Sequence, residues 1–175
     1  MPGSRRPLKR SPDEVDHLVG QWQRERPDVD VAALQVFSRV SRLAVLADRF
    51  RRTAFAAHGL EVWEFDVLAA LRRAGDPYAM TPGALLRVTL VTSATMTHRV
   101  DRLVAAGLVV RDPDPADRRG VLVTLTAAGR QRVDAALTDL LRAEETMLAA
   151  LGAAERDQLA GLLRRLLGPL EQPAP

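Results

Sequence analysis

Hydroxyl, imidazole and guanidinium side chains gather in one short stretch of the sequence, residues 92–102. Thr95, His98, Arg99 and Arg102 are spaced i, i+3, i+4 and i+7, so they share one face of a helix. Such groups bond to phosphate oxygens and base edges, and a helix N-terminus itself favours phosphate. The stretch therefore predicts a helix that reads DNA, although a capped surface helix with a solvated polar face has the same pattern.

The opposite side of this predicted helix, which runs from Thr92 to about Ala106, is apolar. We expect Met96, Val100, Leu103 and Val104 to be buried there. The helix follows a shorter one across a turn, which is the order of a helix-turn-helix, whose second helix enters the major groove. The expected DNA contacts of the second helix are Thr92, Ser93, Thr95, Thr97, His98, Arg99 and Arg102.

A β-hairpin is predicted directly after this helix. Its strands cover residues 108–111 and 121–125, joined by a polar, turn-rich loop over residues 112–120. Arg118 and Arg119 lie at the tip of this loop beside Asp117. The negative potential of a minor groove attracts guanidinium groups, and a neighbouring carboxylate could hold an arginine in position. Asp117, Arg118 and Arg119 are therefore further expected DNA contacts.

The remaining periodicity is helical and places these two elements near the middle of the chain. Residues 1–12 are rich in proline and arginine, and we expect them to be a disordered basic tail. The expected organisation is an N-terminal extra helix and a dimerisation helix over 13–57, a DNA-binding region over 58–125 and C-terminal dimerisation helices over 126–175, within one compact domain. Helices are expected over residues 13–26, 30–57, 61–74, 82–86, 92–107, 126–151 and 153–167.

The long terminal helices carry wide apolar faces that a compact DNA-binding unit would not cover. Such faces must be buried, and a twofold copy of the chain can bury them. The fold expected is mainly α with a small β-hairpin wing, a winged helix-turn-helix that dimerises through its N- and C-terminal helices. A monomer whose terminal helices pack on each other is the alternative.

Composition narrows the function further. The 175 residues carry a net charge of +3, with Lys9 as the single lysine, and an arginine-rich balance suits a nucleic-acid partner or reflects a GC-rich genome. Without cysteine, disulfides and thiolate chemistry are excluded. The histidines are only His17, His58 and His98, and catalytic motifs are missing, so neither an enzyme nor a cofactor is expected. Because the sequence has neither an apolar run of spanning length nor a signal peptide, a cytoplasmic location is expected.

The stretches Thr92 to Arg111 and Asp117 to Gly129 resemble the recognition helix and the wing signature of the MarR (multiple antibiotic resistance regulator) family. The resemblance extends over about residues 31–168 of the helical order. It implies a dimer that binds a pseudo-palindromic operator. It also implies that Arg119 enters the minor groove with Asp117 as its partner.

A ligand pocket is expected around Asp66, which lies in mid-helix among apolar residues. A partly buried carboxylate there needs a cationic partner, and Arg99 and Arg111 are the candidates because they flank the junction of recognition helix and wing. Trp22, on the extra N-terminal helix, could cover the site with its ring. An ordinary Asp–Arg salt bridge, with Trp22 as simple packing, is the alternative.

The same set, Trp22, Asp66, Arg99 and Arg111, resembles the urate-responsive branch of the family, which also has an extra N-terminal helix. This resemblance implies an anionic ligand, purine-like or phenolic, that meets the arginines and releases the DNA. The function expected is a ligand-responsive transcriptional regulator, a repressor acting on an operator. The alternative is an architectural or dimerisation protein that binds DNA without a small-molecule ligand.

Overall fold

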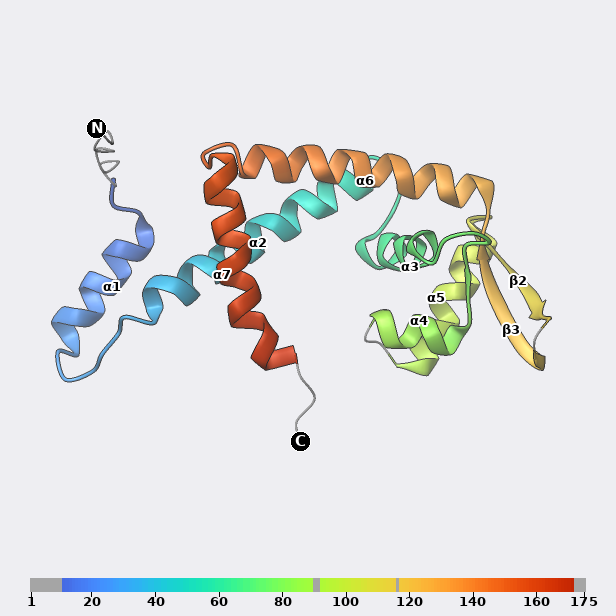
Figure 1. Ribbon diagram of the computed structural model, residues 1–175, viewed down its shortest axis with the longest axis horizontal. Coiled ribbons are helices and arrows are strands. Elements are labelled where there is room, and N and C mark those ends of the chain that lie inside the picture. Colours follow the sequence, from blue (N-terminus) through green and yellow to red (C-terminus); the bar gives the residue numbers. More distant parts are fainter. Residues whose placement is uncertain (1–10, 90–91, 116, 172–175) are drawn as a thin grey trace, which may run out of the picture. The chain divides into compact units, whose positions relative to one another are not determined.

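The computed structural model describes residues 11–89, 92–115 and 117–171, which form helices and one small antiparallel sheet (Figure 1). The chain divides into two compact units, residues 1–49 and 50–175, with the boundary inside the second helix. A mainly helical chain with a small hairpin was the fold class expected, and it is confirmed. The elements are α1 Glu14–Glu25, α2 Leu34–Ala56, α3 Val62–Arg73, β1 Ala79–Met80, α4 Pro82–Thr89, α5 Ser93–Ala105, β2 Val109–Asp114, β3 Asp117–Leu125, α6 Ala127–Met147 and α7 Ala153–Glu171.

In the first unit, α1 is fixed to α2 by one arginine. Asp13 caps α1, and its side chain accepts hydrogen bonds from the backbone N–H groups of Val15 and Asp16. The Arg39 guanidinium donates to both carboxylate oxygens of Asp13 at 2.9 Å and to Asp16 at 2.8 Å. The buried side chains of α1 are Val15 and Val19, whereas Trp22 is 48% exposed.

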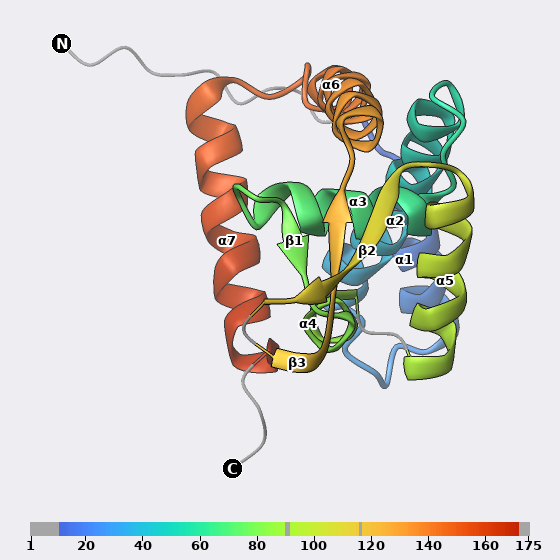
Figure 2. The ribbon, with the colours of Figure 1, turned by 90° about the vertical axis from the view of Figure 1, so that its right-hand side faces the viewer.

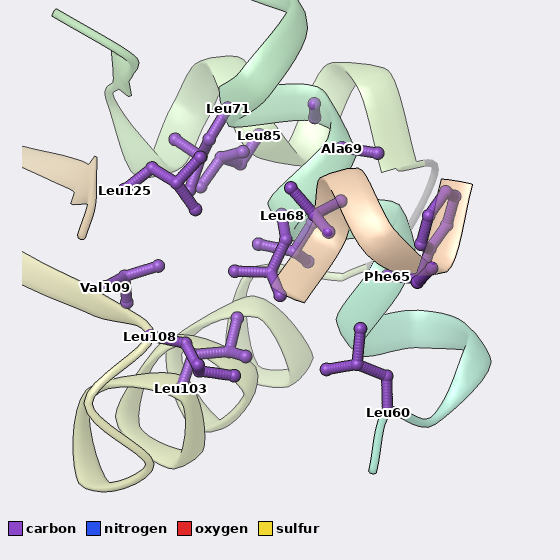
Figure 3. Packing of buried hydrophobic residues seen from close by; sticks show 14 of the residues in the cluster. Leu60, Phe65, Leu68, Ala69, Leu71, Leu85, Leu103, Leu108, Val109 and Leu125 are labelled. Atoms are coloured by element: carbon purple, nitrogen blue, oxygen red, sulfur yellow. The ribbon is translucent and has the colours of Figure 1, made fainter. Parts of the chain in front are cut away.

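The second unit has one apolar core, in which α3 is the most buried helix (Figure 3). Leu68 and Leu71 of α3 are fully buried together with Leu85 of α4 and Leu103 of α5. The rings of Phe55 and Phe65 stack with their centroids 3.9 Å apart, which joins the end of α2 to α3. The core therefore holds the helices of the helix-turn-helix together and leaves their outer faces to solvent.

The sheet has three strands in the order β1-β3-β2, and all pairs are antiparallel (Figure 2). The expected loop over residues 112–120 is wrong, because pairing continues through Asp112↔Leu122 and Pro113↔Val121. Pro113 is tolerated because β2 is an edge strand, where a missing N–H need not break a ladder. The third strand, β1, is the two-residue piece Ala79–Met80, which pairs with Thr124 and Val123 of β3.

Several helix boundaries differ from the expected ranges, which rest on local signals alone. The helix expected from residue 30, with Asp30 as its N-cap, begins at Leu34, because the Asp30 side chain accepts from the N–H of Ala32 in a turn. The helix α4 continues to Thr89 instead of stopping at Leu86. At the other end, α6 stops at Met147, and α7 extends to Glu171 with Pro169 inside it.

Two helices present rows of uncovered apolar side chains. Phe37 on α2 is 60% exposed and Leu170 on α7 is 79% exposed. Isolated exposed leucines are ordinary, but rows of them mark a surface that another molecule covers. The other large exposed apolar side chains of these two helices are Val36, Val40, Leu43, Val45, Leu46 and Phe50 on α2 and Leu162, Leu166 and Leu167 on α7. No helix within the described ranges has the length and apolar character to cross a membrane.

Candidate DNA interface and ligand site

The helix α5 has the two faces that its sequence predicts. Met96, Val100 and Leu103 are buried in the core, whereas Thr95 and His98 are exposed on the outer side. The expected burial of Val104 is wrong: the side chain is 39% exposed, because Val104 lies at the edge of the helix face that Met96, Val100 and Leu103 bury. Because the buried inner face holds α5 in place, its polar outer face is a rigid surface that DNA could contact.

The beginning of α5 is capped by Thr92, the residue at which the sequence predicts the helix to start. The N-cap Thr92 accepts from the N–H of Thr95, and the hydroxyls of the two residues lie 2.8 Å apart. The Thr97 hydroxyl donates to the carbonyl of Ser93, so it is turned back along the helix. Thr92, Ser93, Thr95, Thr97 and His98 are all exposed in this part of the chain. Hydroxyls and free N–H groups at such an end suit phosphate contacts.

The two arginines of α5 are held by the first turn of α3. The Arg102 guanidinium donates to Glu61 at 2.7 Å and lies 4.8 Å from the centroid of the Trp63 ring. The Arg99 guanidinium lies 5.3 Å from the same ring. The hydrogen bond from Arg102, followed by that from the Trp63 indole N–H, lowers the pKa of Glu61 below its ordinary value. Arg102 therefore forms an ion pair with another residue of the chain, which its position on the polar face did not predict.

The hairpin is tied to α5 through Arg111. Its guanidinium donates to the Asp101 carboxylate at 2.6 Å and to the Thr97 carbonyl at 3.4 Å. The carboxylate at Asp101 and the arginine on β2 therefore join the recognition helix and the wing into one piece. Asp117 is the first residue of β3 and pairs in register with Asp114. The side chains of Arg118 and Arg119 lie outside the described residues.

The expected partners of Asp66 are wrong in this structure. Asp66 forms an ion pair with Arg51 at the end of α2, at 2.9 Å, and not with Arg99 or Arg111. Sequence reasoning missed Arg51 because the packing of α2 against α3 brings it near, and no local pattern shows that packing. The Asp66 and Arg51 side chains are 43% and 36% exposed to solvent, so water and small solutes reach the pair. Trp22 belongs to the other unit, and its role stays a prediction.

A short helix, a recognition helix and an antiparallel hairpin in this order define a winged helix-turn-helix. The comparisons with known proteins agree: a model of the MarR family matches residues 58–120. The regulator PecS of Dickeya dadantii is 37% identical over 153 residues, covering 87% of this chain and 92% of PecS. The repressor NicR of Pseudomonas putida is 36% identical over 59% of this chain and 64% of NicR.

Solved structures show the same architecture. A mutant MarR from E. coli complexed with operator DNA matches with a TM-score of 0.66 and 27% identity, covering 79% of this chain and 99% of that one. BpsR of Bordetella bronchiseptica, whose structure concerns regulation of DNA binding by 6-hydroxynicotinic acid, matches with a TM-score of 0.56 and 32% identity, covering 73% and 98%. The chain belongs to the MarR family of winged helix transcriptional regulators. Its relatives are regulators rather than enzymes.

Proposed function

We propose that the chain is a ligand-responsive repressor that binds a pseudo-palindromic operator as a homodimer, with α5 in the major groove and the β2–β3 hairpin in the minor groove. The observation that carries the proposal is the capped, solvent-facing polar face of α5, which Arg111 ties to the hairpin. Linking the two elements lets both grooves be read in one fixed spacing. MarR from E. coli, which has this architecture, has been solved on operator DNA.

The uncovered apolar rows indicate which parts of the chain form the dimer and which part binds DNA. We propose that residues 13–57 and 126–175 form the dimer, while residues 58–125 bind DNA. Two recognition helices related by a twofold axis then meet two half-sites about one helical turn, roughly 34 Å, apart. The exposed rows on α2 and α7 support this assignment, because association of two chains would bury them.

The proposed ligand is a small, flat anion, purine-like such as urate or phenolic. Asp66, Arg99 and Arg111 remain its proposed contacts, and Arg51 joins them because it is the partner of Asp66. The anion would meet the arginines and disturb the bond from Arg111 to Asp101, which orients the hairpin against α5. It must bind the DNA-incompetent form more tightly than the competent one, because otherwise nothing shifts. Regulation of BpsR by 6-hydroxynicotinic acid supports a ligand of this kind.

The test is fluorescence anisotropy with labelled DNA from directly upstream of the chain's own gene, against scrambled DNA at one salt concentration, with and without urate. Selective binding that urate weakens supports both parts of the proposal. Selective binding that ignores urate keeps the regulator and removes urate as its ligand. Equal, weak binding to both DNAs favours the architectural alternative, because a specific regulator prefers its operator by about 10³-fold or more.

The wing is tested by Arg119→Ala. Loss of a minor-groove guanidinium should weaken operator binding strongly, while the dimer and its fold stay intact. The readout is the operator Kd, with circular dichroism as the check on folding. An unchanged Kd would remove Arg119 from the interface.

A further inference from the structure

The first turn of α3 forms a small platform against the outer face of α5. Trp63 lies with its ring 4.8 Å from the Arg102 guanidinium carbon and 5.3 Å from that of Arg99. Its indole N–H donates to Glu61 at 2.7 Å, and the other oxygen of Glu61 accepts from Arg102 at 2.7 Å. Glu64, the one charged side chain buried among the described residues, lies 3.8 Å from Arg102.

This Trp63 platform, made of Glu61, Trp63 and Glu64, is itself firmly held. The Glu64 carboxylate accepts from the N–H of Glu61, which closes a capping box at the start of α3. The Trp63 ring is half-buried and packs against the apolar core. A ring with a fixed base and a fixed hydrogen bond offers the arginines a surface that does not move with them.

The two arginines differ in charge balance. Arg102 is compensated by Glu61 at 2.7 Å, with Glu64 as a second carboxylate. Within the described ranges, no ion pair involves Arg99, whose contact is the face of the Trp63 ring. The Arg102 guanidinium is therefore held in an ion pair. The Arg99 guanidinium is held only by the Trp63 ring, so its charge is available to an anionic partner.

We propose that Trp63, with Glu61, is a positioning residue that fixes the directions of Arg99 and Arg102 before DNA arrives. The inference rests on the proposed function, in which α5 reads the operator. An arginine loses rotamer freedom when it binds, and a side chain already held in its bound direction loses less. The expected gain is about threefold to tenfold in affinity for each arginine so held.

The gain belongs to sequence discrimination rather than to general DNA affinity. An arginine reads guanine through two parallel hydrogen bonds, which require one orientation of the guanidinium plane. Attraction to phosphates needs only the charge, and it sets the salt dependence of binding. Losing the platform should therefore lower operator affinity, while leaving the affinity for scrambled DNA and its salt slope unchanged.

The experiment compares Trp63→Leu with Tyr78→Leu. The Tyr78 ring also lies beside two arginines, at 5.1 Å from Arg72 and 5.5 Å from Arg130, but neither belongs to α5. We expect Trp63→Leu to weaken operator binding about tenfold with scrambled-DNA binding unchanged, and Tyr78→Leu to leave both unchanged. Trp63→Phe, which keeps a ring, should restore most of the discrimination. Thermal melting of each variant provides the folding check.

The direction in which Glu61→Gln changes operator affinity decides between two roles of Glu61. If Glu61 orients Arg102, the variant should weaken operator binding. If Glu61 instead competes with DNA for Arg102, the variant should bind more tightly, and the proposal is overturned. It is also overturned if Trp63→Leu and Tyr78→Leu have equal effects, or if both lose affinity for scrambled DNA in parallel.

Failure of this inference can be told apart from failure of the proposed function with Arg99→Ala and Arg102→Ala. If these variants lose operator binding while Trp63→Leu keeps it, α5 reads DNA without the platform and only the inference fails. If neither arginine variant affects operator binding, α5 is not the reading helix, and both proposals fall together. The expected result is that Arg99→Ala and Trp63→Leu lose discrimination by similar factors.

Discussion

At Gly129, the backbone of α6 lies directly against Leu108 and Leu125 at the base of the hairpin. A Cβ built there would lie 2.1 Å from the carbonyl oxygen of Leu108 and 2.9 Å from Cδ1 of Leu125. The Leu108 carbonyl also accepts from the N–H and the hydroxyl of Thr126, so it has no freedom to withdraw. Only glycine lets the helix approach this closely.

Gly129→Ala should therefore destabilise the fold. Overpacking against an immobile backbone costs about 1–3 kcal/mol, which lowers the Tm of a chain of this size by a few degrees, about 2–4 °C for each kcal/mol. The measurement is thermal unfolding followed by circular dichroism. Gly20→Ala is the control, because its Cβ would meet only the flexible end of Arg24 at 3.7 Å. That variant should be neutral or more stable by up to about 1 kcal/mol.

Asp66→Asn tests the ligand site at a single residue. The variant removes one charge from the pair with Arg51, and we expect it to abolish the response to the ligand while operator binding remains. Asp134→Asn is the matched control, because Asp134 pairs with Arg72 at the same 2.9 Å and its side chain is 44% exposed against 43% for Asp66. Anisotropy with and without urate gives the answer. An intact response in Asp66→Asn would leave Asp66 only a structural role.

The sequence revealed local signals at single residues and missed those that depend on packing. The helix starts predicted at residues 92 and 126 and the helix end at residue 107 agree with the caps Thr92 and Thr126 and with the left-handed Gly107, whose φ is 70°, because each signal depends on a few neighbouring residues. The contact between Arg102 and Glu61 joins residues 41 positions apart and was invisible. One signal could have pointed to this contact. Glu61 and Trp63 stand at the start of a predicted helix, and an acidic and an aromatic side chain can both hold an arginine.

Among the elements, α1 is attached to α2 through the bonds from Arg39 to Asp13 and Asp16. The hydrogen bond from Arg39 lowers the pKa of Asp13, and the backbone N–H of Asp13, followed by Arg39, lowers that of Asp16. A lowered folded pKa means that the contribution is fully present above the ordinary value, about 3.9, and is lost as the pH falls through the lowered value. The attachment should therefore be constant from pH 5 to 8 and weaken only below about pH 4.

Arg39→Gln should release α1 at every pH. The measurement is amide hydrogen exchange of residues 14–25 across pH 3–7, corrected for intrinsic rates. Arg26→Gln is the control, because Arg26 forms a similar two-bond pair with Asp28 that does not connect α1 to α2. Equal exchange in the two variants would mean that burial of Val15 and Val19 alone holds the helix.

The order of the elements was predicted more accurately than their lengths. Apolar periodicity, helped by start and stop signals, predicted each helix found in the described part of the chain, because a face buried in a core repeats with the helical period. The hairpin was predicted too short, since charged residues and prolines at its tip resemble a loop, yet the backbone pairing continues to Asp114↔Asp117. Pairing of this kind depends on the partner strand, and a residue pattern in one strand cannot show it.

For the whole molecule, the uncovered rows on α2 and α7 predict the effect of a charge placed within them. Phe37→Glu or Leu166→Glu should give monomers, and operator affinity should fall by a factor of about 10² or more because each monomer meets one half-site. Size-exclusion chromatography with light scattering and operator anisotropy are the measurements. Gln158→Glu places the same residue on an exposed polar position of α7 and should leave the dimer unchanged. A fully dimeric Leu166→Glu variant would remove α7 from the interface.

Because of the same apolar rows, stability and operator occupancy should both depend on the concentration of the protein. A chain that buries them only on meeting a second chain has a Tm that rises with concentration, since association stabilises by mass action. In the proposed dimeric repressor, two chains must meet before one operator can be occupied. At low copy number, occupancy of the operator would therefore rise more steeply than in proportion to the number of chains, and halving the gene dosage would relieve repression by more than half.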